Sequence, residues 1–367
     1  MDKPEDKQEK KSPAPKVEQK AAAKQGKSPG KALPDISKLS GARPTKIPRA
    51  VKKAEEIAAI TTPKVDFKIV ALGAAALFVL VGIVYANSIY GGLVFNDATQ
   101  FGHLAQLQKT EGAGLELWAQ ALSKPLTQGW VALTMFWDLQ SFRWNPGWSH
   151  VVNVFLHFFA SLYLYLLVFR LAWRWRNDDR IKADPYVVAL TVSGLFALHP
   201  LATGSVAYIS ARTGPLLALN YFLSLNLFVA GCLSENLWFA FFAYLLAITV
   251  NAAALMCNAQ AITIPFTSVC LLLLLKPKAD TWKHWLLNRG YELFLFGLLA
   301  AGLPFLLLTG ARPTISNGAG LSALAPLSYY ASQCKSLLTY YARGFFAPFG
   351  LTLDPPYTIA PNFSDPL

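Results

Sequence analysis

The sequence predicts an all-α, polytopic membrane protein with about seven transmembrane helices. Hydrophobic residues make up 54% of its 367 residues and charged residues only 15%, which is too apolar for a water-soluble domain of this size. Runs of about 20 apolar residues, the length that spans a bilayer core, recur along the chain. Clusters of Lys and Arg follow some of these runs at positions that one consistent topology places in the cytoplasm.

Seven segments are expected to be membrane helices, namely residues 67–86, 150–171, 185–198, 214–233, 237–253, 262–275 and 291–308. Basic residues precede the first segment and follow the second and sixth, so the positive-inside rule places the N-terminus in the cytoplasm. The chain then reads as an integral protein of a bacterial inner membrane with an external C-terminus. Its three parts are a tail (1–66), the helical module (67–309) and an external C-terminal part (310–367).

The tail, residues 1–66, is basic and rich in Lys, Ala, Pro and Ser. Through residue 67 it holds sixteen Lys and Arg against nine Asp and Glu, so +7 of the net charge of +12 lies here. Such a segment buries too little apolar area to fold, and we expect a disordered tail that binds anionic lipid or a cytoplasmic partner. Because the excess charge belongs to this one segment, nucleic acid is not the expected partner.

Two external regions are expected. Residues 87–148 form a long loop rich in tryptophan, in which residues 128–139 are apolar but too short to span and fit a helix lying in the interface. Residues 329–346 either span the membrane or lie flat outside it. The flat position is favoured because Gln333, Lys335 and Arg343 would be costly at mid-span.

Histidines and cysteines carry weaker signals. The four cysteines, Cys232, Cys257, Cys270 and Cys334, lie in or beside apolar runs without paired spacing, so no disulfide framework is expected. A histidine metal site remains an alternative, built from His150, His157 and His199 with Asp97 or His103. Buried helix histidines more often bond an internal partner, so no metal ligand is assigned.

Several motifs occur in order over about residues 68–358. They are Phe95-Asn96-Asp97, Lys124-Pro125-Leu126-Thr127, the run from His150 to His157, His199-Pro200 followed by Val206 to Arg212, Gln260 to Pro265, and Tyr341 to Asp354. Together they resemble the GT-C superfamily of membrane glycosyltransferases. The resemblance is greatest to O-mannosyltransferase-like proteins with tetratricopeptide repeats, whose later helices and repeats have no counterpart in these residues.

The resemblance implies an enzyme that takes a sugar from a polyprenyl-phosphate donor on the external face. Such transfer needs a carboxylate base, and the resemblance maps it to Asp97. It also implies that Asn96, His199 and Arg212 bind substrate, with Lys335 and Arg343 helping to hold the lipid phosphate.

Structural alternatives stand beside these roles. Asp97 is equally an Asx-turn or helix-cap residue, Arg212 an interfacial anchor, and Lys335 and Arg343 ordinary snorkelling side chains.

Three acidic positions of the resembled family are missing. They map to Gly204, Gly214 and the Cys257-Asn258-Ala259 stretch, and no acid between Pro185 and Leu353 lies on the predicted external side. The leading hypothesis is therefore a non-catalytic scaffold or lipid-binding subunit of a membrane complex, and a divalent metal is not expected. The alternative is a working glycosyltransferase with Asp97 as base. A transporter is disfavoured because no internal repeat and no acid within the spans were found.

Overall fold

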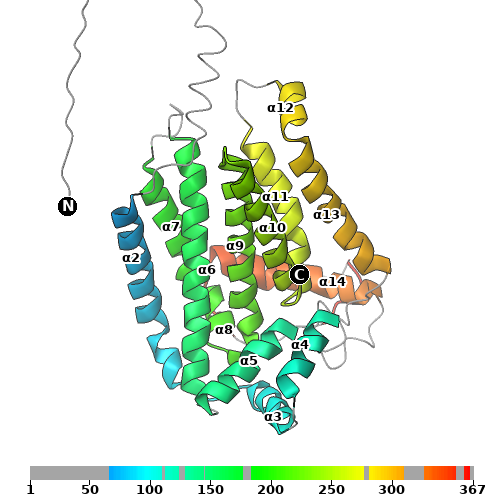
Figure 1. Cartoon of the computed structure of the whole chain (residues 1–367). Helices are drawn as coiled ribbons and strands as arrows, with labels where there is room; N and C mark the ends of the chain where they lie inside the picture. Colours follow the sequence, from blue (N-terminus) through cyan, green and yellow to red (C-terminus); the bar gives the residue numbers. More distant parts are fainter. Residues whose placement is uncertain are drawn as a thin grey trace, which may run out of the picture. The chain divides into compact units, whose positions relative to one another are not determined.

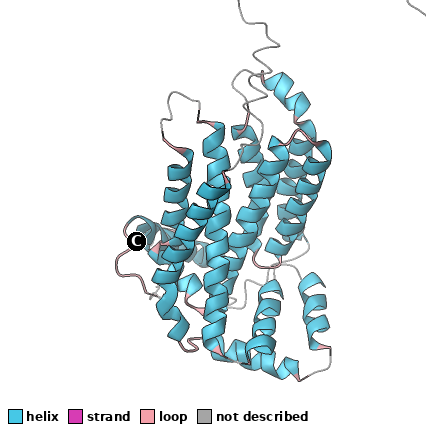
Figure 2. Ribbon diagram, turned by 60° about the vertical axis from the view of Figure 1, so that its left-hand side comes forward, coloured by secondary structure: helices cyan, strands magenta, loops and turns pink. Residues whose placement is uncertain are grey.

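The computed structural model describes residues 66–109, 112–123, 129–143, 145–176, 183–276, 281–309, 326–352 and 359–363. All of them belong to one compact unit, Ala50–Leu367, and they contain helices without any strand (Figure 2). The all-α prediction is therefore confirmed over this part of the chain. The predicted tail, apart from Asp66, lies outside the described residues.

A helix forms in each of the seven predicted segments. These helices are α2 (Phe67–Tyr85), α6 (Pro146–Arg174), α7 (Pro185–Ala197), α9 (Thr213–Leu233), α10 (Leu237–Leu255), α11 (Thr263–Leu274) and α13 (Gly290–Thr309). Local capping explains several starts, because the side chains of Asp66, Asn145, Asp184 and Asn236 accept backbone N–H groups of the first turn. Proline follows two of these caps, at the helical position where its missing N–H costs nothing.

Within the described residues, four helices are long and apolar enough to cross a membrane, and a fifth span results if one bent pair is counted. The four are Lys68–Tyr90, Pro146–Arg174, Ile209–Leu233 and Leu237–Leu255. In the bent pair, α7 meets the segment Pro200–Val206 at 47°. A helix thus forms at each of the seven predicted places, but not every one of these helices is long enough to count as a span. Helix α11 with its leading turn, for example, covers only Ala259–Leu274.

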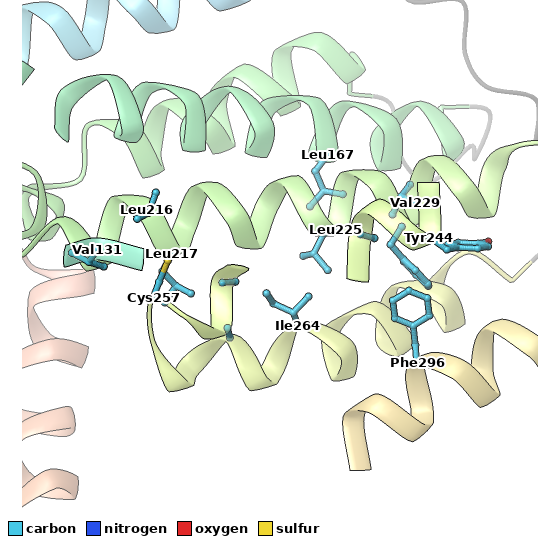
Figure 3. Packing of buried hydrophobic residues seen from close by; sticks show 14 of the residues in the cluster. Val131, Leu167, Leu216, Leu217, Leu225, Val229, Tyr244, Cys257, Ile264 and Phe296 are labelled. Carbon is cyan, nitrogen blue, oxygen red and sulfur yellow. The ribbon is translucent and has the colours of Figure 1, made fainter. Parts of the chain in front are cut away.

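Helix α9 lies at the centre of the packing, with α6, α10 and α11 against it (Figure 1). Figure 3 shows its buried leucines and valines meeting Leu167 of α6 and Ile264 of α11. Glycine permits the closest approach between α9 and α10, because a Cβ on Gly231 would lie 2.5 Å from the Tyr244 ring. Small residues at such crossings let membrane helices pack closely.

The region predicted as a long loop contains three helices, α3 (Asp97–Gln108), α4 (Ala113–Ser123) and α5 (Gly129–Phe142), after the short η2 (Ala86–Tyr90). The helix expected near 128–139 is α5. Helices α3 and α4 were not predicted, because short helices of mixed polarity carry no long apolar run. They are held by burial of Phe101 and Leu104 of α3 and of Leu117 of α4 in the core that also contains residues of α9.

Short turns connect the long helices at the ends of the bundle. They are η3 (Pro200–Ala202), α8 (Thr203–Val206), η4 (Ile209–Arg212), η5 (Ala259–Ile262) and α12 (Trp282–Asn288). The stretch from His199 to Arg212, which holds η3, α8 and η4, is called the 199–212 segment below.

The expected helix at 329–346 runs from α14 (Pro326–Ser336) through the π-helical η8 (Leu337–Ala342) into α15 (Arg343–Phe346). It is not one of the candidate spans. In Figure 1, α14 lies across the direction of α6.

The reactivity of two cysteine thiols, one buried and one exposed, tests this packing. Cys257 is fully buried, and burial raises the pKa of its thiol to about 12, whereas Cys334 is exposed. Because the thiolate is the reacting form, we expect a maleimide at pH 7.5 to label Cys334 in the folded protein and to leave Cys257 unlabelled until denaturation. Peptide-level mass spectrometry measures both sites in one sample. Labelling of Cys257 as fast as that of Cys334 would contradict the fold.

Candidate functional site

A pocket of about 600 Å³ lies among three separate stretches of the chain. Phe95 lines it from the turn before α3, Tyr208 from the 199–212 segment, and Tyr340 and Tyr341 from η8. Thr203, Ser205 and Thr352 add hydroxyl groups, and the remaining lining residues are Pro200, Leu201, Gly204 and Leu351. Among the described residues, the lining is therefore aromatic and hydroxylic and includes no charged side chain.

Asp97, the residue expected to act as base, is fully buried beside this pocket and is not one of its lining residues. Its Oδ1 accepts from the Ser210 backbone N–H at 2.8 Å and from the Ser210 hydroxyl at 2.5 Å. Its Oδ2 accepts from the Val94 N–H at 3.1 Å. Three donors thus engage the carboxylate, and its bonds join the turn before α3 to the 199–212 segment.

Asn96, expected to bind substrate, is exposed at the N-cap position of α3 and its side chain makes no capping bond. Its backbone N–H donates to the Tyr208 hydroxyl at 3.4 Å. Phe95 packs edge-on against the same tyrosine, with ring centroids 5.8 Å apart. This turn therefore lies at the edge of the pocket.

Arg212, expected to hold a phosphate, is fully buried at the start of α9. It forms an ion pair with Asp138 of α5, donates from Nε to Asn153 Oδ1 at 2.7 Å, and donates to the Ser149 carbonyl at 3.2 Å. Its Nη1 has no hydrogen-bond partner. The guanidinium therefore joins α5, α6 and α9, and it does not reach the pocket lining.

Asn153 extends this network into the backbone. Its amide donates to the carbonyls of Val206, Tyr208 and Ile209 at 3.3, 3.3 and 3.5 Å. The network fixes the backbone that carries Tyr208 to the pocket.

His199 connects the 199–212 segment to the C-terminal helix. Its Nδ1 accepts from the Leu201 N–H at 3.2 Å, so the Nε2 that lies 3.1 Å from the Phe345 carbonyl is the protonated nitrogen. The imidazole also stacks on the Phe345 ring at 5.4 Å. These contacts hold α15 beside the pocket.

Lys335 and Arg343 lie on α14 and α15, and neither lines the pocket. Arg343 is exposed, and Lys335 is half-buried. The structure therefore does not bring the expected cationic residues together with Arg212.

The histidines expected as alternative metal ligands lie in different surroundings. His157 Nε2 bonds the Ala197 carbonyl at 2.9 Å, whereas His150 is buried with neither ring nitrogen hydrogen-bonded. Over the described ranges, no three His, Cys, Asp or Glu side chains form a group suited to a metal ion. The residues that are described do not fit the divalent metal that some GT-C enzymes hold.

The structure also describes the positions at which the resembled family carries acids and this chain does not. Gly204 lines the pocket, while a Cβ on Gly214 would meet the Ser205 side chain at 3.0 Å. Asn258 caps η5 by accepting the Gln260 N–H, and Cys257 is buried. None of these positions supplies a carboxylate.

Sequence reasoning missed Asp138, Ser210 and Tyr208 as partners of the predicted residues. The sequence held one indication for Asp138, because an acid within an apolar helix usually pairs with another polar group. Ser210 and Tyr208 carried none, since hydroxyl residues are common in turns.

No family model, curated protein or solved structure matches this chain. The GT-C resemblance therefore remains an expectation from the motifs.

The Arg212–Asp138 pair provides a stability test. Removing one partner of a buried ion pair leaves an uncompensated charge, and we expect Asp138→Ala to lower the free energy of unfolding by about 3–5 kcal/mol. Thermal unfolding in detergent measures the loss. The matched control Glu116→Ala, an exposed acid on neighbouring α4, should change stability by about 0.5 kcal/mol or less. Equal effects of the two changes would contradict the structural role of the pair.

Proposed function

We propose that this chain is a non-catalytic, GT-C-like module of seven membrane helices that binds a lipid-linked ligand as a subunit of a membrane complex. Its pocket faces the external side of a bacterial inner membrane, with the N-terminus in the cytoplasm and the C-terminus outside. The basic tail attaches to anionic lipid or to a cytoplasmic partner.

The observation that carries the proposal is that the Asp97 carboxylate is buried and accepts three hydrogen bonds from the surrounding fold. A general base needs a lone pair directed at the proton it removes. The Asp97 carboxylate instead accepts three hydrogen bonds from Ser210 and Val94 and is shielded from solvent. The Asp97 carboxylate therefore stabilises the fold by joining the turn before α3 to the 199–212 segment.

The pocket supports the same conclusion, because transfer from a phosphate donor requires cationic or metal groups at the leaving phosphate. No charged residue lines the pocket in the described part of the chain, and Arg212 is paired with Asp138. Aromatic and hydroxyl groups are suited to binding without bond cleavage.

A working glycosyltransferase with Asp97 as base is the second candidate. The observation that favours it is the short distance along the chain between Asp97 and the pocket. Phe95, two residues before Asp97, lines the pocket, and so does Tyr208, whose hydroxyl accepts the backbone N–H of Asn96. Exposure of the carboxylate would require Ser210 to release it.

Turnover separates the two. We expect the purified protein, incubated with radiolabelled polyprenyl-phosphate sugars, to retain the intact lipid and to release no labelled product, because none of the described residues that line the pocket carries a carboxylate. Retention after gel filtration measures binding, and chromatography of the extracted lipid measures turnover.

Asp97→Asn and Glu116→Gln serve as a matched pair, since both neutralise an acid of the same predicted external region. Product formation that disappears in Asp97→Asn and persists in Glu116→Gln would establish the enzyme instead. Failure of wild-type protein to retain any lipid-linked sugar would remove the binding function.

A further inference from the structure

Phe95 has an unusual backbone conformation. Its φ is +48°, and the next residue has φ −83° and ψ −1°. These angles resemble a type II′ turn, whose first central position normally holds glycine. A bulky side chain with positive φ is a true outlier in proteins and stores strain.

The surrounding bonds maintain this strained turn. The Asp97 N–H donates to the Val94 carbonyl at 3.0 Å, while the Val94 N–H donates to Asp97 Oδ2. Ser210 anchors the other carboxylate oxygen. The turn is thus closed by Asp97 and attached to the 199–212 segment.

Burial of the aromatic ring does not offset the strain. Phe95 remains 64% exposed, with its ring edge-on to Tyr208 at the pocket. Strained residues persist where the surrounding structure enforces them, and they gather at ligand sites. Presentation of the ring to a ligand accounts for its position.

A second irregularity lies on another wall of the same pocket. The π-helical η8 contains the consecutive residues Tyr340 and Tyr341, which both line the pocket. The Tyr340 hydroxyl is held by the backbone of Thr352, while the Tyr341 side chain is 52% exposed. Short π-helical turns inside helices are frequent at functional sites.

We propose that Phe95 contacts the ligand directly, that the pocket accepts an uncharged, hydroxyl-bearing ring such as a sugar between Phe95, Tyr208 and Tyr341, and that Asp97 is a positioning residue for Phe95. This inference rests on the proposed binding function and specifies which part of the lipid-linked ligand enters the pocket.

The lining selects against other ligand classes. A phosphate would enter without a cation to meet it, because none of the described Lys and Arg residues lines the pocket. An acyl chain would displace water from the hydroxyls of Ser205 and Thr352 and offer them no hydrogen bond in return, which costs free energy. A neutral ring with hydroxyls satisfies those groups and packs its apolar faces on aromatic rings.

The test uses methyl glycosides of glucose, mannose, galactose and N-acetylglucosamine as probes, with inorganic phosphate as the charged comparison. Ligand-observed NMR on the full chain in nanodiscs measures affinity. We expect at least one glycoside to bind and phosphate not to bind. Binding of phosphate alone, or of no glycoside, would overturn the ligand class.

Phe95→Gly separates contact from structural support. Glycine adopts positive φ without strain, so we expect an unchanged or raised unfolding temperature together with an affinity for the glycoside about tenfold weaker or more. Tyr90→Gly is the matched control, because Tyr90 is 91% exposed and lies outside the lining; its affinity should equal that of wild type. Unchanged affinity in Phe95→Gly would refute the contact role of Phe95.

The positioning role of Asp97 has its own readout. Asp97→Asn removes the acceptor of the Val94 N–H, so it should weaken glycoside binding in wild type and have little further effect in Phe95→Gly. Additive losses would refute positioning through Phe95. If wild type retains lipid-linked sugar while these variants bind glycosides normally, this inference fails and the proposed function stands. If neither probe binds, both fail.

Discussion

The buried ion pair between Arg212 and Asp138 is the constraint on which the pocket end of the bundle depends. A guanidinium enclosed at the start of a membrane helix must be neutralised and hydrogen-bonded, because an unpaired charge there is very costly. Asp138 supplies the charge from α5, so α5 packs against the bundle. Asn153 completes the network and also holds the carbonyls of Val206 and Ile209. The backbone that carries Tyr208 and Ser210 is fixed as a result, and with it the pocket and the surroundings of Asp97.

The ionic side chains of this region are consequently engaged in the fold rather than directed at a ligand. Asp97 closes a turn and Arg212 joins three helices, whereas His199 holds α15 through Phe345. What remains at the pocket surface is aromatic and hydroxylic. A site of this composition distinguishes ligands by shape, stacking and neutral hydrogen bonds. Among the described residues that line the pocket, none carries a charge, and this composition supports the binding role that we propose.

The opposite end of the long helices has a different chemistry. Arg176 lies over the Trp173 ring at 4.5 Å, and Lys276 lies over the Trp282 ring at 4.9 Å. Cations beside indole rings are typical of the boundary between lipid and water. Between the two ends, α10 presents exposed aromatic and leucine side chains, including Phe239, Phe242 and Leu245. These observations agree with a bilayer around the helices.

The sequence by itself determined where the long helices form, because apolar length, caps and basic clusters are local properties of the chain. It also identified Asp97, Arg212 and His199 as notable residues. Only the tertiary structure decided what they do: Arg212 meets Asp138 across 74 positions, and Asp97 meets Ser210 across 113. Such pairings depend on how the helices pack, which no local pattern encodes. Helices α3 and α4 were missed for the same reason, since their stability comes from burial in the core that they share with α9 and not from their own composition.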